Sequence, residues 1–337
     1  MENTRITKQK EYQGFYKNAE GEAEVVNLTS TTYRPDLDMG AFITQAQPLT
    51  IRPTRSKRPT RGDSLTLAMG DAQIGYYNNE PFHDERAMAL GILAVVELKP
   101  DNICLTGDMI DLPAQSKFEQ RSGWQQSVQK SIDRYHSFLG ELRANAPDAN
   151  IVVVHGNHEE RMPKMIRRDA AELMGLRRAN AEQELGVLTL QYLCRYADLE
   201  VQGITGYPNG THWLEDDLRV THGTQAKKGG QSAANYLKNE QVSTIFGHDH
   251  RLQIAWQTRA VRGGGKDTVA ASPGCLARTD GYVPGFNFTT DESGVVVPKS
   301  EDWQQGVLLI QHNERNHDVT PLRISEQGIN IGGNYYE

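Results

Sequence analysis

The order of apolar runs and helical segments from Ser64 onward is the feature that most constrains how this chain can fold. Short runs of apolar and β-branched residues predict strands at Leu65–Met69, Asn102–Thr106 and Ile151–Val154. Helical periodicity predicts helices between these strands, one through Leu98 that begins after the N-cap Asp84 and one at Gln125–Ala144. Such an alternation requires parallel crossover connections, so the sequence predicts an α/β core.

The remainder of the chain divides into an extension, a domain and a tail. Residues 1–61 show no sustained period and predict an N-terminal extension of unknown function, with at most a short strand around Val25 to Leu28. One or two helices are expected after Glu159. Further strands are predicted at Leu218–Thr221, Val242–Phe246, Leu252–Ala260, Thr268–Ala271, Val307–Gln311 and Asp318–Leu322. We therefore expect one catalytic-type domain at 62–325 and a C-terminal tail at 326–337.

The composition excludes several classes of protein. The chain has 337 residues, and its net charge of −7 disfavours non-specific coating of nucleic acid. No apolar stretch approaches the roughly 20 residues of a membrane-spanning helix, and the polar N-terminal residues lack the apolar core of a signal peptide. The three cysteines have no CxxC spacing, which predicts neither a disulfide framework nor a zinc knuckle. We expect a cytoplasmic protein without membrane contact.

Side chains that can bind metals follow five of the predicted strands, each next to a small residue. The segments are Gly70-Asp71-Ala72-Gln73, Gly107-Asp108-Met109-Ile110-Asp111, Gly156-Asn157-His158-Glu159, His222-Gly223 and Gly247-His248-Asp249-His250. Glycine lets the chain turn sharply, and open α/β sheets place their ligands at the carboxyl ends of the strands. Asp, Asn and His without a thiolate suit two hard or borderline divalent ions such as Mn²⁺, Mg²⁺, Fe or Zn²⁺.

The order of these motifs resembles the calcineurin-like metallophosphoesterases, whose signature runs D-x-H, G-D-x-x-D, G-N-H-[DE], H and G-H-x-H. The resemblance covers about Ser64 to Leu322. It implies a four-layer αββα sandwich of two mixed β-sheets and a dinuclear metal centre. In such a centre the two ions share a hydroxide and aim it in line at phosphorus. The D-x-Q form of the first motif is also similar to phage-borne members of the family.

Carried over residue by residue, the resemblance assigns roles to nine positions. The expected metal ligands are Asp71, Gln73 and His250 for the first ion, Asn157, His222 and His248 for the second, and Asp108 as the bridge between them. His158 would protonate the leaving alkoxide as a general acid, and Asp111 would hold the His158 ring by a hydrogen bond. These two residues are the expected catalytic groups.

Gln73 departs from the family pattern, which has His at this position. A glutamine amide ligates through its oxygen or through a metal-bound water, and it is a weaker ligand than imidazole. We therefore expect a looser first site that favours Mg²⁺ or Mn²⁺, with Mn²⁺ the expected metal, and that chelators empty easily.

The substrate is expected to be a nucleotide or nucleic-acid phosphodiester. The Ser/Thr phosphatases of the family carry an arginine after the second motif and another before the third, where this chain has Leu112 and His155. The spacing of the ligands leaves a phosphomonoesterase as an alternative. A non-catalytic binding scaffold is a further alternative, since Gln73 is one sign of an eroded site.

Aromatic and basic residues between His158 and His222 predict a rim over the site. They are Arg161, Lys164, Arg167, Arg168, Tyr207 and Trp213. Such a combination suits nucleotides, although an ordinary solvated helix has the same composition. For Arg161, the sequence leaves open a contact to the substrate phosphate or a position at the start of a surface helix.

Overall fold

A computed structural model describes most of the chain. The described residues are 4–17, 23–35, 63–115, 127–182, 184–261, 264–281, 288–290, 296–298 and 302–337. Internal contacts divide the chain into two compact units, Met1–Leu49 and Thr50–Glu337. The predicted domain boundary at residues 61 and 62 lies outside the described residues.

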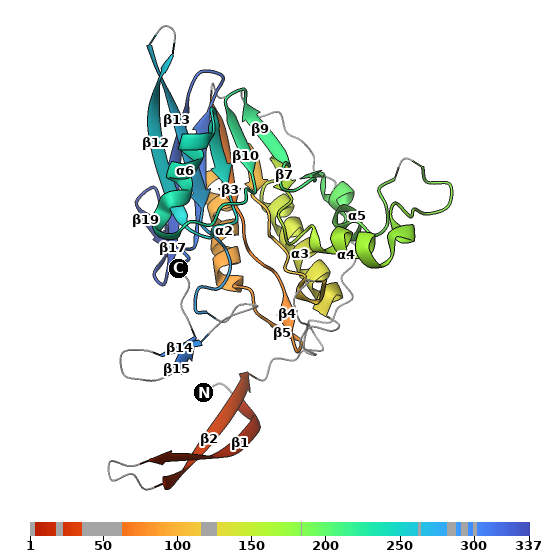
Figure 1. Ribbon diagram of the computed structural model, residues 1–337, viewed down its shortest axis with the longest axis vertical. Helices are drawn as coiled ribbons and strands as arrows, with labels where there is room; N and C mark the ends of the chain where they lie inside the picture. The colour runs from red at the N-terminus through yellow and green to blue at the C-terminus, as the bar shows by residue number, and fades with distance from the viewer. Residues whose placement is uncertain are drawn as a thin grey trace. The chain divides into compact units, whose positions relative to one another are not determined.

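The N-terminal unit contains an antiparallel pair of strands, β1 (Thr4–Lys17) and β2 (Ala23–Pro35) (Figure 1). The register shifts once, between Ile6 and Lys8. The sequence prediction of at most a short strand around residues 25–28 is therefore wrong. Polar and charged residues interrupt the alternation in both strands, so hydrophobic periodicity gave no signal for the pairing.

Two mixed sheets form the larger unit. The eight-stranded sheet has the order β19-β18-β17-β16-β3-β6-β7-β8, with parallel pairing from β3 to β8 and antiparallel pairing of β16 with β3. Its strands are β3 (Ser64–Met69), β6 (Asn102–Leu105), β7 (Asn150–Val154), β8 (Val201–Ile204), β16 (Gly306–His312), β17 (His317–Ser325), β18 (Gly328–Ile331) and β19 (Asn334–Tyr336). The segment expected to be a tail thus contributes β18 and β19 to this sheet.

The five-stranded sheet has the order β12-β13-β11-β10-β9. Its strands are β9 (Thr211–Glu215), β10 (Leu218–Thr221), β11 (Ser243–Phe246), β12 (Leu252–Val261) and β13 (Gly264–Pro273). Short pairs are formed by β4 (Tyr76–Tyr77) with β5 (Glu80–Pro81) and by β14 (Phe288–Thr290) with β15 (Val296–Pro298). All the strands predicted in the domain are present, whereas the short strands β4, β5, β8, β9, β14 and β15 were not predicted.

The helices confirm the predicted alternation. They are α2 (Glu85–Leu98), α3 (Ser127–Asn145), α4 (Arg161–Asp169), α5 (Leu190–Leu193) and α6 (Gln231–Asn239), with 3₁₀ turns at Pro113–Gln115, Ala171–Leu173, Tyr196–Leu199 and Lys228–Gly230. Asp84 caps α2 as predicted, because its Oδ1 accepts a hydrogen bond of 3.0 Å from the Ala87 amide. In the part of the chain that the structure describes, no helix has the length and apolar character needed to cross a membrane.

Three apolar clusters separate four layers. Alternate residues of each central strand point to opposite faces of the eight-stranded sheet, as Ile103 and Cys104 of β6 illustrate. Ile103 packs with α2 and α3 residues in one cluster, and Cys104 packs against the five-stranded sheet in another. Phe246 joins α6 residues in the third cluster. The predicted four-layer αββα sandwich of two mixed sheets is therefore confirmed (Figure 1).

Candidate metal centre

The site lies at the carboxyl ends of strands from both sheets. Asp108 follows β6, His222 follows β10 and His248 follows β11. Gly156, just after β7, permits the close approach, because a Cβ there would clash with Oδ1 of Asp108. The turn glycines predicted from the sequence thus bring the loops of separate strands together.

Five of the predicted ligands have left-handed backbone conformations. Their φ angles are 51° at Asp71, 48° at Gln73, 49° at Asp108, 75° at His248 and 59° at His250. Each such residue costs on the order of 1–3 kcal/mol and persists only where the surrounding structure enforces it. Strain of this kind concentrated at strand ends is typical of functional sites.

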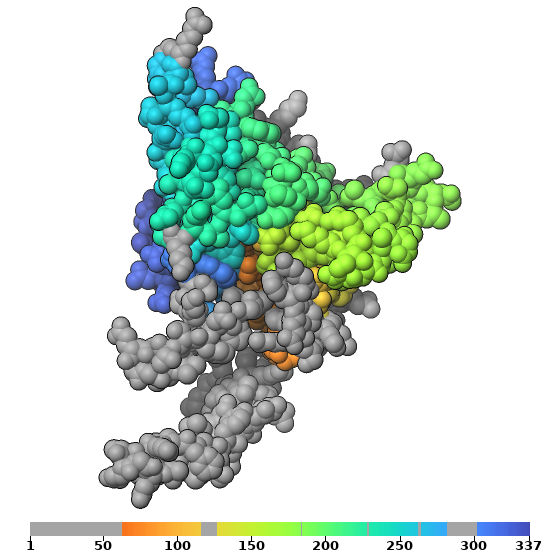
Figure 2. Space-filling view, viewed as in Figure 1, coloured from red at the N-terminus to blue at the C-terminus, as the bar shows by residue number. Residues whose placement is uncertain are grey.

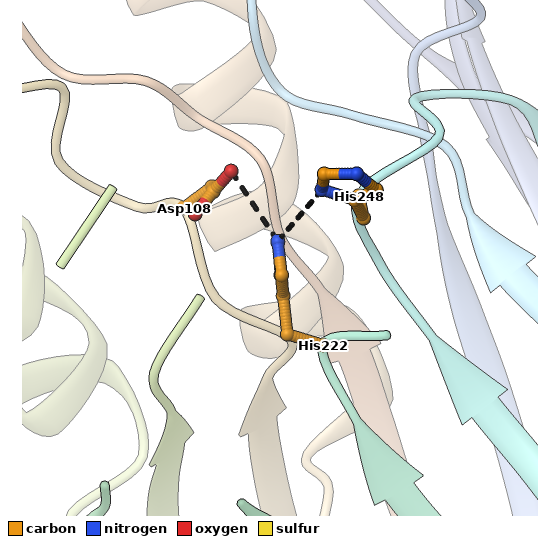
Figure 3. Close-up of side chains that lie close together, drawn as sticks. All are labelled: Asp108, His222 and His248. Carbon is orange, nitrogen blue, oxygen red and sulfur yellow. Dashed lines mark hydrogen bonds and ion pairs between the residues drawn. The ribbon is translucent and has the colours of Figure 1, made fainter. Parts of the chain in front are cut away.

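His222 is the centre of the first group of side chains. Its Nε2 lies 3.3 Å from Oδ2 of Asp108, 3.3 Å from Nδ1 of His248 and 3.2 Å from Oδ1 of Asn157. Figure 3 shows this nitrogen directed between the Asp108 carboxylate and the His248 ring. The other ring nitrogen, Nδ1, contacts the backbone oxygen of Thr106 at 2.7 Å, which fixes the orientation of the ring.

The electrostatics of this group indicate that it can hold a cation. Burial alone would lower the pKa of His222, but the carboxylate of Asp108 outweighs burial and raises that pKa to about 10. Burial likewise opposes ionisation of Asp108, yet His158 and His222 hold the pKa of Asp108 well below its usual range. A positive charge among these side chains is therefore stabilised.

A second group contains the remaining predicted ligands. Oδ1 of Asp71 lies 3.1 Å from Nε2 of His250, and Nε2 of Gln73 lies 3.4 Å from the same nitrogen. The ring of Trp303 covers His250, with 4.1 Å between the ring centroids. Nδ1 of His250 has no hydrogen-bond partner among the described residues.

His158 lies beside the first group, where the sequence predicted a proton donor. Its Nδ1 is 3.0 Å from Oδ1 of Asp111, and its Nε2 is 3.6 Å from Oδ2 of Asp108. Burial opposes protonation, but the carboxylates of Asp108 and Asp111 outweigh it and raise the pKa of His158. The imidazole of His158 can thus carry a proton close to the Asp108 carboxylate.

Arg161 occupies the first position of α4 and also contacts the site. Its guanidinium lies 2.9 Å from Nε2 of His158 and hydrogen bonds to Oδ1 of Asp111. The position at a helix start is therefore confirmed for Arg161, and its contact with the substrate phosphate stays a prediction. The Arg161 side chain is 21% exposed and remains reachable from solvent.

Glu159 is a buried residue whose role sequence reasoning missed. Its carboxylate accepts hydrogen bonds from the backbone amides of Asp108 (2.9 Å), Met109 (2.8 Å) and Gly156 (2.8 Å). Burial raises the pKa of Glu159. The carboxylate ties the second and third motif loops together and so positions Asp108. The acid directly after His158 in the third motif was the available signal.

Tyr207 and His155 border the site on the side of α4. The ring centroid of Tyr207 lies 5.7 Å from that of His222, so Tyr207, like Arg161, is a residue of the predicted rim that contacts the site. The ammonium of Lys164 is 5.4 Å from the Tyr207 ring centroid. Burial lowers the pKa of His155 to about 4, which leaves its imidazole neutral at pH 7.

The structure brings all nine predicted site residues into two contiguous groups. Ligand atoms of Asp108, His222 and His248 all lie within 4.8 Å of one another, which is compatible with a shared metal ion. Carboxylate oxygens, amide groups and imidazoles together suit divalent cations of the Mn²⁺, Mg²⁺, Fe and Zn²⁺ series. The residues present therefore fit a metal centre, and the assignment of each ligand to one ion remains a prediction.

The chain is similar to several known proteins. The Gene 54 protein of Mycobacterium phage D29 is 24% identical over 200 residues, which are 56% of this chain and 69% of that protein. A single mutant of Vps29 from Entamoeba histolytica matches with a TM-score of 0.34 and 14% identity over 79% of this chain and 96% of that chain. YfcE, a phosphoesterase from E. coli, matches with a TM-score of 0.31 and 12% identity over 76% of this chain and 98% of that chain.

The family model for calcineurin-like phosphoesterases matches residues 66–252. This range contains every predicted ligand as well as His158 and Asp111, and it covers more than half of the chain. The family match thus supports a metal-dependent phosphoesterase. The chain belongs to the calcineurin-like phosphoesterase family.

Proposed function

We propose that the protein is a dinuclear phosphodiesterase that hydrolyses a nucleotide or nucleic-acid phosphodiester, with Mn²⁺ as the working metal. In this proposal Asp71, Gln73 and His250 would hold one ion. Asn157, His222 and His248 would hold the other, and Asp108 would be the ligand shared between them. The bound ions would lower the pKa of the attacking water and neutralise charge on the phosphoryl oxygens.

The side chains around the ions supply positioning and proton transfer. Asp111, 3.0 Å from Nδ1 of His158, orients the ring and stabilises its protonated form. His158 then donates its proton to the leaving oxygen of the ester, which is required when the leaving group is an alkoxide. Glu159 keeps Asp108 in place through three backbone amides.

The preference for a diester rests on the groups at two motif positions. Leu112 and His155 are both buried and uncharged at neutral pH, at the positions where the Ser/Thr phosphatases of the family carry arginines. A phosphomonoester carries about two negative charges near neutral pH and a diester carries one, as the second pKa of phosphate near 6 requires. A site without these two guanidiniums suits the diester.

A phosphomonoesterase is the second candidate, and Arg161 favours it. Its guanidinium lies at the proposed catalytic pair and is partly exposed. If a terminal phosphate displaced Asp111 from Arg161, this guanidinium would bind the dianion directly, as arginines commonly do. Arg161 therefore distinguishes the two candidates.

The test compares Mn²⁺-dependent hydrolysis of bis-p-nitrophenyl phosphate and p-nitrophenyl phosphate, with Asp108→Asn as the blank. The proposal predicts a kcat/KM for the diester at least about tenfold above that for the monoester. A preference for the monoester that disappears in Arg161→Ala would establish the phosphatase instead. Both substrates have the same leaving group, so the comparison reports on phosphate charge and on the second substituent.

A further inference from the structure

A cavity of about 520 Å³ lies next to the metal centre, between α4, the segment from 173 to 191 and the loop after β8. We call it the α4 cavity. Its walls include Ile166, Met174 and Leu188, and His155, Gln191 and Tyr207 add polar groups. Figure 2 shows the yellow-green surface of α4 and the following segment, beside which the green surface of β9 begins.

Tyr207 connects the α4 cavity to the metal centre. It lines the cavity, and its ring lies 5.7 Å from the ring of His222. Glu159 lines the same cavity and accepts hydrogen bonds from the Asp108 and Gly156 amides. Lys164 places its ammonium 5.4 Å from the Tyr207 ring centroid, at this junction. When the phosphate of a substrate lies at the metal centre, a group bonded to that phosphate can therefore reach the α4 cavity.

The lining favours a flat heterocycle over a purely apolar group. His155 is 4% exposed, and its Nε2 has no hydrogen-bond partner among the described residues. A buried polar atom without a partner costs free energy that a bound ligand recovers by hydrogen bonding to it. Apolar walls with a few polar groups are typical of small-molecule sites, and the volume lies within their usual range. An alkyl chain would leave Nε2 of His155 unsatisfied.

We propose that the α4 cavity binds the nucleobase of one ester group while the phosphate lies at the metal centre. The apolar side chains of Ile166 and Met174 contact the faces of the base, and His155 hydrogen bonds to its edge. The cavity thereby determines specificity for nucleoside diesters. This inference rests on the proposed phosphodiesterase function and names the substrate group that the α4 cavity selects.

The test uses two chromogenic diesters that share one leaving group. Thymidine 5′-(p-nitrophenyl phosphate) carries a nucleoside, and ethyl p-nitrophenyl phosphate does not. We expect kcat/KM of the unaltered full-length protein with Mn²⁺ to favour the thymidine diester by about a hundredfold, because the base supplies binding energy remote from the reacting bond. A ratio near one overturns the inference.

Met174→Trp and Leu176→Trp provide a matched pair of variants on the same exposed segment. Met174 lines the α4 cavity, whereas Leu176 does not, and both side chains are about half exposed (46% and 51%). Met174→Trp should fill the cavity and reduce the substrate ratio at least about tenfold, whereas Leu176→Trp should preserve it. An unchanged ratio in Met174→Trp overturns the inference.

Binding of thymidine without phosphate separates this inference from the proposed function. Calorimetry with the Mn²⁺-loaded protein should detect thymidine, and His155→Phe should weaken the affinity about tenfold by removing the ring nitrogen. If neither diester is hydrolysed but p-nitrophenyl phosphate is, the phosphodiesterase proposal fails. If thymidine binds and Met174→Trp abolishes this binding, the result would still support the α4 cavity as a nucleobase site. If thymidine does not bind, that assignment is overturned.

Discussion

The two halves of the metal centre differ in how tightly their side chains converge. Around Nε2 of His222, three groups lie at 3.2 or 3.3 Å, and they come from three other loops. Around Nε2 of His250, Asp71 lies at 3.1 Å, but Gln73 presents its Nε2 at 3.4 Å rather than its oxygen. Ligation by Gln73 through oxygen requires the amide to turn.

The difference indicates that the His222 half forms the stronger site. The His222 half combines a carboxylate, an amide and two imidazoles. The His250 half has one imidazole, and Gln73 stands where the family pattern has a second histidine. Nitrogen ligands bind the later divalent metals more strongly than amide oxygen does. Selective loading of the His222 half should therefore precede loading of the His250 half.

Asp108→Asn should have the largest effect, because it weakens the bridge that we propose between the two halves. We expect kcat/KM on bis-p-nitrophenyl phosphate to fall at least about a thousandfold, equivalent to about 4 kcal/mol, together with loss of bound Mn²⁺. Metal analysis and steady-state kinetics check both effects. Asp133→Asn removes an exposed carboxylate on α3 and should change neither. Full activity in Asp108→Asn would contradict the proposal that Asp108 is a ligand of both ions.

His158→Ala should lower activity without removing metal from either half. We expect turnover of a dinucleotide, which has an alkoxide leaving group, to fall about a hundred- to a thousandfold. Hydrolysis of bis-p-nitrophenyl phosphate should fall less than about tenfold, because p-nitrophenolate leaves without protonation. His136→Ala on α3 is the control. Equal losses on both substrates would rule out the proposed proton transfer by His158.

Addition of Mn²⁺ should stabilise the folded protein, because only the folded chain brings the ligands around His222 together. At about a hundred times the dissociation constant, binding adds about 2.7 kcal/mol to the free energy of unfolding. Thermal melts with and without a chelator measure the change. The increase should be smaller in His222→Ala, which loses a ligand of the stronger half. A melting temperature that does not respond to Mn²⁺ would speak against metal binding.

Gln73→His should produce the smallest effect and abolish the asymmetry between the halves. A second imidazole beside His250 should tighten the weaker site about tenfold for Zn²⁺, equivalent to about 1.4 kcal/mol. Competition with a fluorescent chelator measures the affinity. Gln129→His places the same substitution on the exposed face of α3 and serves as the control. An unchanged Zn²⁺ affinity in Gln73→His would show that residue 73 is not a metal ligand.

Local sequence signals predicted the parts of the fold that depend on nearby residues. The β-branched run of β7, the cap at Asp84 and the glycine turns each act within a few positions. The N-terminal strands β1 and β2 lack such a signal and were missed. The strands β8 and β9 are only four and five residues long, so their assignment depends on neighbours in the sheets.

The candidate site was predicted as a set of residues, whereas its asymmetry was not. The motifs named Asp71, Gln73 and His250, but the distances between residues 177 positions apart depend on how the two sheets pack. The contact between the rings of Trp303 and His250 likewise depends on how distant segments of the chain pack. Backbone strain at these positions had no sequence signal, since left-handed Asp and His residues look ordinary in a sequence.

The number and coupling of bound Mn²⁺ ions distinguish a dinuclear centre from a single metal site. Equilibrium dialysis followed by electron paramagnetic resonance measures both quantities on the unaltered protein. If Asp108 bridges the two halves as proposed, the protein should bind two Mn²⁺ per chain at saturation, with unequal affinities and a spin-coupled spectrum. Saturation at one uncoupled Mn²⁺ per chain would contradict this proposal.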